Sequence, residues 1–202
     1  MSRINRREFI KQAGLFGAIV AWGSRTAHAS TLSPQERRDL FPQGVASGDP
    51  AADSVILWTR RPPIDKAAEK LTVEVAEDSD FRRVIAKSVS SISADADWTC
   101  RVLVAGLKPK TVYWYRFTDE QGFGSRTGRT ITAPLPNDGR TVNFAFVSCQ
   151  DINEGKLNAY RRMIYEDERA HADQQLDFVL HLGDFIYEVV QYPEEVKTRY
   201  DR

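Results

Sequence analysis

Three side chains with metal-binding chemistry follow two apolar segments in this chain of 202 residues. Cys149 comes near the end of VNFAFVSCQD (142–151), and Asp184 and Tyr187 come near the end of LDFVLHLGDFIYE (176–188). A thiolate combined with a phenolate favours a strongly Lewis-acidic ion such as Fe(III), whereas Mg²⁺ or Ca²⁺ alone would prefer oxygen ligands. Taken singly, each residue also fits a structural role, as a buried cysteine, a helix N-cap or a packing aromatic. Their combination predicts a metal site.

The two apolar segments are predicted to be adjacent strands of a parallel sheet. Residues 156–173 between them place apolar side chains at helical spacing, so strand, helix and strand form one βαβ unit, the start of an α/β domain. Because sites in such sheets form beyond the carboxyl ends of the strands, we expect the three side chains to converge at one edge. Gly183 leaves room for the backbone to turn. His181 is predicted to pack in the strand or to support the ligands rather than to bind metal.

An earlier part of the chain, residues 38–134, is predicted to form a β-sandwich of the fibronectin type III or immunoglobulin-like kind. Segments rich in β-branched and aromatic residues alternate there with turn signals, such as Gly48-Asp49-Pro50. In the segment WTCRVLV, Cys100 falls on the apolar face and is predicted to be a small buried hydrophobe. The predicted strands are Ser54–Arg60, Leu71–Glu77, Trp98–Leu107 and Thr111–Asp119.

The segment GLKPKTVYWYRF (106–117) predicts a tyrosine corner in this sandwich. In that motif, a Tyr hydroxyl bonds back to the backbone of the preceding turn. Tyr113 is the candidate because it is the first Tyr after the turn, and Tyr115 is the alternate. Residues 135–141 are predicted to be a linker between the sandwich and the second domain, residues 142–202.

The N-terminus predicts a cleavable export signal over residues 1–29. Arg6 and Arg7, followed by Phe-Ile-Lys, have the spacing of a twin-arginine signal. The apolar stretch that follows is about half of the roughly 20 residues that a membrane-spanning helix needs. The small-residue motif Ala-His-Ala then predicts cleavage between Ala29 and Ser30. The alternative is an amphipathic helix. We expect a periplasmic or secreted protein with no stable membrane insertion after cleavage.

The charge and cysteine contents argue against two classes of protein. The chain balances 28 basic against 28 acidic residues, and without residues 1–29 the counts are 23 and 27, a net charge of −4. Such a chain lacks the strongly basic character of a nucleic-acid scaffold. Two cysteines, Cys100 and Cys149, are too few for a disulfide scaffold, although they could in principle pair in the periplasm.

Together these motifs resemble the alkaline phosphatase D family of exported metallophosphoesterases. The similarity covers almost the whole chain: the twin-arginine signal, the opening FPQGVASGDPAADSVILWTR (41–60), the Gly-Leu-x-Pro-x-Thr-x-Tyr corner, and the VSCQ and LHLGDFIYE blocks. The GDxxY block alone also resembles purple acid phosphatases, but their first strand supplies an Asp where this chain has Cys149.

The resemblance implies a reaction and its cofactors. It implies that residues 142–202 begin a metallophosphoesterase domain with Fe(III) and Ca²⁺, in which Cys149 and Tyr187 ligate iron and Asp184 bridges iron to calcium. It also implies hydrolysis of phosphate mono- or diesters at alkaline pH, by in-line attack of a metal-bound hydroxide. The implied partners are the phosphate-ester substrate and the twin-arginine export machinery.

The resemblance further implies that the metallophosphoesterase domain is incomplete in this stretch of chain. Further ligands, including an Asn-His or Asp-His motif, would lie beyond Arg202, and two strands cannot cover their own parallel sheet. We therefore expect the stretch by itself to be inactive. The alternative from another class is a non-enzymatic periplasmic module that binds partners through its β-sandwich, and it leaves the three metal-binding side chains unexplained.

Export should depend on the two N-terminal arginines. The double substitution Arg6→Lys with Arg7→Lys should strand the precursor in the cytoplasm, because the export receptor reads the guanidinium pair. Cell fractionation followed by immunoblotting measures the distribution. Continued secretion of the double variant would contradict the twin-arginine assignment.

Overall fold

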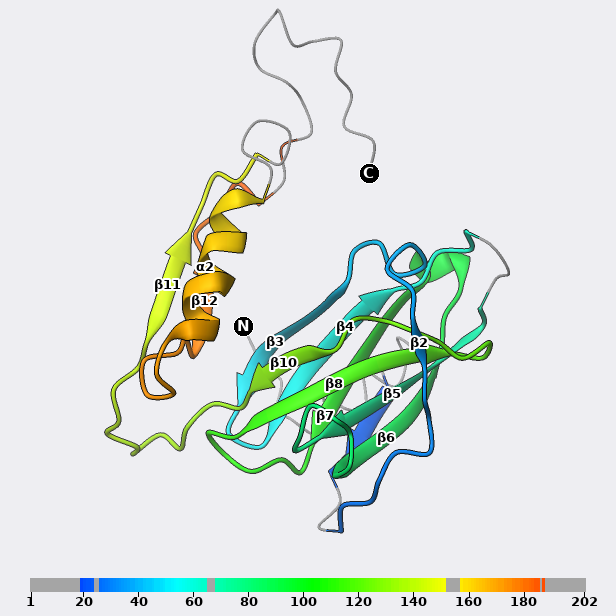
Figure 1. Ribbon diagram of the computed structural model, residues 1–202, viewed down its shortest axis with the longest axis horizontal. Helices are drawn as coiled ribbons and strands as arrows, with labels where there is room; N and C mark the ends of the chain where they lie inside the picture. The colour runs from blue at the N-terminus through cyan, green and yellow to red at the C-terminus, as the bar shows by residue number, and fades with distance from the viewer. Residues whose placement is uncertain (1–18, 24–25, 65–67, 152–156, 186, 188–202) are drawn as a thin grey trace, which may run out of the picture. The chain divides into compact units, whose positions relative to one another are not determined.

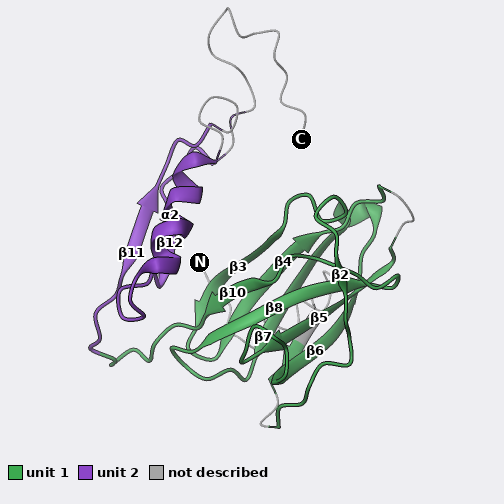
Figure 2. Cartoon of the chain, in the orientation of Figure 1, with its two compact units in different colours: residues 1–138 green, residues 139–202 purple. Residues whose placement is uncertain are grey.

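The computed structural model describes residues 19–23, 26–64, 68–151, 157–185 and 187 (Figure 1). Contacts divide the chain into two compact units, unit 1 with residues 1–138 and unit 2 with residues 139–202 (Figure 2). The division falls inside the predicted linker, residues 135–141. Arg6 and Arg7 lie outside the described residues.

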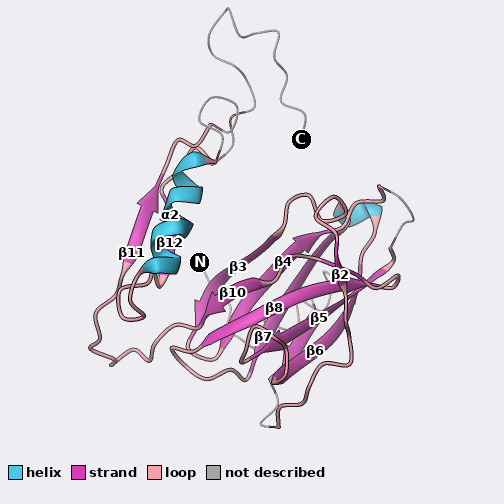
Figure 3. Cartoon of the chain, in the orientation of Figure 1, coloured by secondary structure: helices cyan, strands magenta, loops and turns pink. Residues whose placement is uncertain are grey.

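Unit 1 is built from two β-sheets (Figure 3). One has the strand order β1-β7-β4-β3, with bounds Ile19–Trp22, Thr99–Ala105, Ser54–Arg60 and Val45–Ala51. The other sheet has the order β2-β9-β8-β5-β6, and β10 also pairs with β8. The bounds of β2, β9, β8, β5 and β6 are Gln35–Glu36, Phe123–Gly124, Val112–Asp119, Lys70–Ala76 and Val84–Ser91. Strand β10 spans Gly128–Ile131. The pairs β1–β7 and β2–β9 are parallel. A 3₁₀ turn, η1 (Ala94–Ala96), lies between β6 and β7.

The two sheets share one hydrophobic core. The residues of this core alternate along the central strands, as expected where one face of each sheet packs against the other. Cys100 is 0 % exposed, so its predicted burial is confirmed. The core residues contributed by β4, β5, β7 and β8 are Val55, Leu57, Leu71, Val73, Val75, Cys100, Val102, Val104, Tyr113, Tyr115 and Phe117.

The four predicted strands are present as β4, β5, β7 and β8, with ends displaced by at most one or two residues. The turn predicted at Gly48-Asp49-Pro50 is wrong, because these residues lie within β3. The register of β3 with β4 shifts between Gly48 and Ala51, and Asp49 has a φ of 48°. An end strand of the sheet tolerates such a bulge and a proline because one side of its ladder carries no strand partner.

Strand β1 lies inside the segment predicted to be the export signal. It pairs with β7 from Ile19 opposite Val102 to Trp22 opposite Ala105. Ala21 is buried, and Trp22 is exposed. Among the described residues, no helix has the length and apolar character needed to cross a membrane. The export signal stays a prediction. In this structure, β1, which lies within the predicted signal, forms the end strand of the four-stranded sheet.

A fully buried ion pair joins the two sheets. Arg61 directly follows β4, and its Nε donates over 3.1 Å to Oδ2 of Asp119, the last residue of β8. Both side chains are 0 % exposed. Oδ1 of Asp119 accepts the backbone N–H groups of Gln121 and Phe123 over 3.0 and 2.9 Å, which closes the turn after β8. Removing one partner of such a buried pair costs about 3–5 kcal/mol.

Tyr113 forms the predicted tyrosine corner. Its hydroxyl accepts the backbone N–H of Lys108 over 2.9 Å, and its side chain is buried. Thr132 supports the same turn, because its hydroxyl donates to the Lys108 carbonyl over 2.6 Å and accepts the Thr111 N–H over 3.0 Å. The prediction for Tyr113 is therefore confirmed, and the corner fixes the connection from β7 to β8.

Unit 2 contains β11 (Phe144–Val147), α2 (Asn158–Arg169) and β12 (Phe178–His181). The two strands are parallel neighbours, so the order and direction of these elements match the predicted βαβ unit. Phe178, Val179 and Leu180 are between 44 % and 47 % exposed. Within the described residues, β12 is therefore not covered on both faces, as a central parallel strand would be.

Replacing Tyr113 by Phe should destabilise unit 1 while leaving its fold intact. The ring still fills the core, but the Lys108 N–H loses its acceptor. The expected loss in the free energy of unfolding is about 1–2 kcal/mol. Guanidinium unfolding monitored by tryptophan fluorescence measures it as a lower midpoint at an unchanged slope. An unchanged midpoint would show that the corner hydrogen bond contributes nothing.

Candidate metal centre

The in-register pairing of β11 and β12 brings their carboxyl ends to one edge. Val147 is the last residue of β11 and lies opposite His181, the last residue of β12. The pairing continues past both strands, because the Leu182 N–H donates to the Val147 carbonyl over 2.8 Å. The Cys149 N–H then donates to the Gly183 carbonyl over 3.2 Å. The two chain segments therefore leave the sheet side by side.

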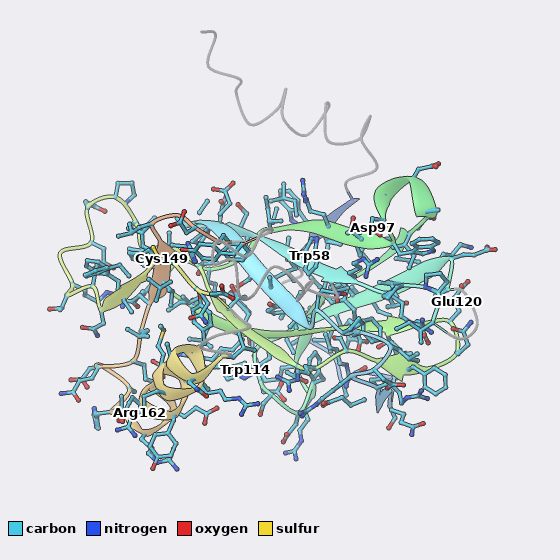
Figure 4. The ribbon with its side chains drawn as sticks, turned by 90° about the horizontal axis from the view of Figure 1, so that it is seen from above. Trp58, Asp97, Trp114, Glu120, Cys149 and Arg162 are labelled. Atoms are coloured by element: carbon cyan, nitrogen blue, oxygen red, sulfur yellow. The ribbon has the colours of Figure 1, made fainter. Side chains whose placement is uncertain are left out.

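The three predicted metal-binding side chains meet at this edge. The Cys149 thiol lies 3.2 Å from Oδ2 of Asp184, and the Tyr187 hydroxyl lies 3.1 Å from the same oxygen. Both groups are proton donors to one carboxylate oxygen. Cys149, labelled in Figure 4, and Asp184 are exposed. The expected convergence is present, while the role of these residues as metal ligands stays a prediction.

The backbone is left-handed at several points of the site. Cys149 has a φ of 55° and Asp184 a φ of 50°, a region that residues with a side chain enter at a cost. Gly183, between the strand and Asp184, has a φ of 125°. A Cβ built on Gly183 would meet no atom within 4 Å, so the backbone angle rather than a lack of space requires glycine there. The left-handed backbone at Cys149 and Asp184 is energetically unfavourable, and it sets the positions of their side chains.

The surroundings of Tyr187 keep its hydroxyl protonated. The hydrogen bond with Cys149, burial, and the hydrogen bond and negative charge of Asp184 together raise the pKa of Tyr187 well above its usual value. Each of these influences favours the neutral phenol over the phenolate. A bound cation acts in the opposite direction, because it stabilises the anionic forms of nearby ligands.

The donor set fits a strongly Lewis-acidic ion better than an alkaline-earth ion. Deprotonated Cys149, Asp184 and Tyr187 carry one negative charge each, which a trivalent cation neutralises. Calcium prefers oxygen donors, of which the carboxylate of Asp184 is the suitable one in this set. In the described part of the chain, no group of three His, Cys, Asp or Glu side chains could hold a metal ion. Here the third donor is a tyrosine, which is not one of those four types.

The two residues at the predicted cleavage position lie on unit 1. His28, just before Ala29, pairs with Val84 through two backbone hydrogen bonds of 3.1 and 2.8 Å. The Ser30 N–H donates to the Phe81 carbonyl over 2.9 Å. The Ser30 hydroxyl lies 2.8 Å from each carboxylate oxygen of Glu74, a buried residue that also accepts from Arg116. The predicted cleavage position is thus held by pairing in this structure.

Comparison with protein families finds matches over both units. Residues 25–134 match the family profile described as PhoD-like phosphatase, N-terminal domain. Residues 144–202 match the profile described as PhoD-like phosphatase. The second match begins at the first residue of β11 and includes all three residues of the candidate metal centre.

Individual proteins show the same similarity. The chain is 37 % identical over 196 residues to alkaline phosphatase D of Bacillus subtilis strain 168, an alignment that covers 91 % of this chain and 32 % of the relative. A solved structure titled "Structure of PhoD" superimposes with a TM-score of 0.64 at 37 % identity, over 81 % of this chain and 30 % of that one. The chain thus spans about a third of the length of the curated relative.

The two cysteines should differ sharply in thiol reactivity. Both are free thiols; Cys149 is exposed, whereas burial raises the pKa of Cys100 to about 11. With a disulfide reagent at about pH 8, near the pKa of an ordinary thiol, one thiol per folded chain should react, and the second only after unfolding. Cys149→Ser should abolish the reaction of the folded chain, and Cys100→Ser should leave it unchanged. Equal reactivity of the two would contradict the placement of Cys100.

Proposed function

Because the chain belongs to the PhoD-like phosphatase family, we propose that it supplies part of the active site of an exported, metal-dependent phosphatase that hydrolyses phosphate mono- or diesters at alkaline pH. The observation that carries the proposal is the meeting of Cys149, Asp184 and Tyr187 on one carboxylate oxygen at the edge of a parallel sheet. That edge is where α/β folds place their sites.

Fe(III) is the proposed ion on Cys149, Asp184 and Tyr187. Three anionic ligands neutralise a trivalent ion, whereas a divalent ion with the same ligands would keep a net negative charge and repel an anionic phosphate ester. Ca²⁺ is the proposed second ion, and Asp184 would help to hold both ions, because a carboxylate has two oxygens available to cations. When bound, the two ions supply an activated water molecule and neutralise charge on the phosphoryl oxygens.

The chain's own residues position the ligands for this chemistry. Asp184 holds the thiol of Cys149 and the phenol of Tyr187 on one oxygen, so the three donors are already gathered from two separate segments. The hydrogen bond from Cys149 N–H to the Gly183 carbonyl ties those segments together directly beside the donors. Because Cys149 and Asp184 are exposed, a phosphate ester can reach them from solvent.

The proposed location is the periplasm or the extracellular space, reached through the twin-arginine machinery. Support comes from the Arg6–Arg7 pair and from the small-residue motif before Ser30. A route that exports folded proteins suits an enzyme whose metal ions are inserted before export. The proposed partners are accordingly a phosphate-ester substrate and the export machinery.

Tyr187→Phe tests the iron-ligand role. The substitution keeps the ring and removes only the oxygen, so it separates metal binding from packing. In the iron-loaded full-length protein, Tyr187→Phe should abolish or strongly shift the visible phenolate-to-Fe(III) band, and phosphate-ester turnover should fall by roughly tenfold or more, the scale expected when a group around a metal is removed. Cys149→Ser should cause a related loss, because a serine hydroxyl is a much poorer anionic ligand than a thiolate.

Tyr165→Phe is the matched control, because Tyr165 lies on α2 in the same unit and its exposed ring packs against Arg169. It should leave the band and the turnover unchanged. A chelator should abolish turnover of the unsubstituted full-length protein; turnover that resists a chelator would remove the case for a metal-dependent enzyme. If Tyr187→Phe kept the visible Fe(III) band and the turnover of the unsubstituted protein, Tyr187 would be a packing residue and not a metal ligand.

A further inference from the structure

His181 occupies a position that links its own strand to the turn carrying Asp184. It is the last residue of β12, and its Nδ1 accepts the backbone N–H of Gly183 over 3.3 Å. Its ring packs edge-on against Phe185, with 4.8 Å between centroids and an interplanar angle of 69°. Among the described residues, its Nε2 is enclosed and has no hydrogen-bond partner.

Gly183 is held from both sides by these contacts. Its N–H donates to His181, and its carbonyl accepts the N–H of Cys149 over 3.2 Å. The first bond closes the turn that follows β12, and the second joins that turn to the segment that follows β11. Because Gly183 has a φ of 125° and Asp184 a φ of 50°, the turn needs such bonds to hold one conformation.

We propose that His181 is a positioning residue of the candidate metal centre. It holds the Gly183 N–H and thereby sets the direction of the Asp184 carboxylate toward Cys149 and Tyr187. This inference rests on the proposed function for its consequence in metal binding, whereas the hydrogen bond itself can be tested without metal.

The role requires one tautomer of the imidazole. Nδ1 accepts a hydrogen bond only when it carries no proton, so the proton of the neutral ring sits on Nε2. In that state Nδ1 is already used by Gly183. His181 therefore acts through the turn and not as a ligand. The chemical requirement at this position is a hydrogen-bond acceptor one bond beyond Cγ.

Three substitutions separate this acceptor from the ring. His181→Asn places its amide oxygen where Nδ1 lies and removes the enclosed Nε2. His181→Gln moves the amide one carbon farther, and His181→Phe keeps an aromatic ring without any acceptor. Phe185→Leu is the matched control, because it removes the ring contact and leaves the hydrogen bond in place.

The first measurement uses the metal-free, ¹⁵N-labelled chain. Amide exchange at Gly183 should be about fivefold to tenfold faster in His181→Phe and His181→Gln, as expected for the loss of one hydrogen bond. It should stay near the unsubstituted rate in His181→Asn and Phe185→Leu. The Leu182 amide, which is bonded to Val147, should keep its rate in all four variants. The proposal would be overturned if His181→Asn and His181→Phe changed the exchange rate of the Gly183 amide equally, or if His181→Phe left that rate unchanged.

The second measurement is Fe(III) binding to the full-length protein, read from the visible band during titration. Affinity should fall about tenfold to a hundredfold in His181→Phe and His181→Gln and be restored in His181→Asn. Unchanged affinity in His181→Phe would overturn the positioning role. If the unsubstituted full-length protein bound no iron, the proposed function would fail, while Gly183 exchange would still decide whether His181 holds the turn.

Discussion

The parallel register of β11 and β12 is the constraint on which the candidate metal centre depends. Val147 and His181, the last residues of their strands, are paired, so both strands end at the same position along the sheet. Two backbone hydrogen bonds beyond the ladder keep the exits together. A slip of one residue would turn the side chains of one strand to the other face and shift its exit along the sheet. Cys149 and Asp184 would then no longer share a hydrogen bond.

Beyond the strands, the site combines unfavourable backbone angles with hydrogen bonds that hold them. Cys149 and Asp184 both adopt left-handed conformations, and Gly183 lies beside Asp184 with a φ of 125°. Such angles persist only where the surroundings determine them. Here Gly183 makes two hydrogen bonds, one from its N–H to His181 and one from the Cys149 N–H to its carbonyl. In addition, one carboxylate oxygen of Asp184 accepts hydrogen bonds from the Cys149 thiol and the Tyr187 hydroxyl. These contacts gather the three candidate ligands at one carboxylate oxygen.

The large buried core and the candidate metal centre lie in different units of the chain. Unit 1 has a core shared by two sheets, a buried Arg61–Asp119 pair and a tyrosine corner at Tyr113. Unit 2 has the three candidate metal ligands, but the apolar residues of β12 remain nearly half exposed. The family matches cover both units separately, the sandwich by one profile and the βαβ unit by another.

The amino-acid sequence by itself determined the side-chain chemistry at the strand ends, the positions of β4, β5, β7 and β8, the burial of Cys100 and the corner at Tyr113. These features follow from local periodicity and turn chemistry, which a short stretch of sequence contains. Only the tertiary structure decided the bulge in β3, the pairing of β1 with β7, and the sharing of one Asp184 oxygen by Cys149 and Tyr187. The reason is that these features depend on contacts between separate segments: Cys149 and Asp184 are 35 residues apart, and no local pattern records which of their atoms will meet.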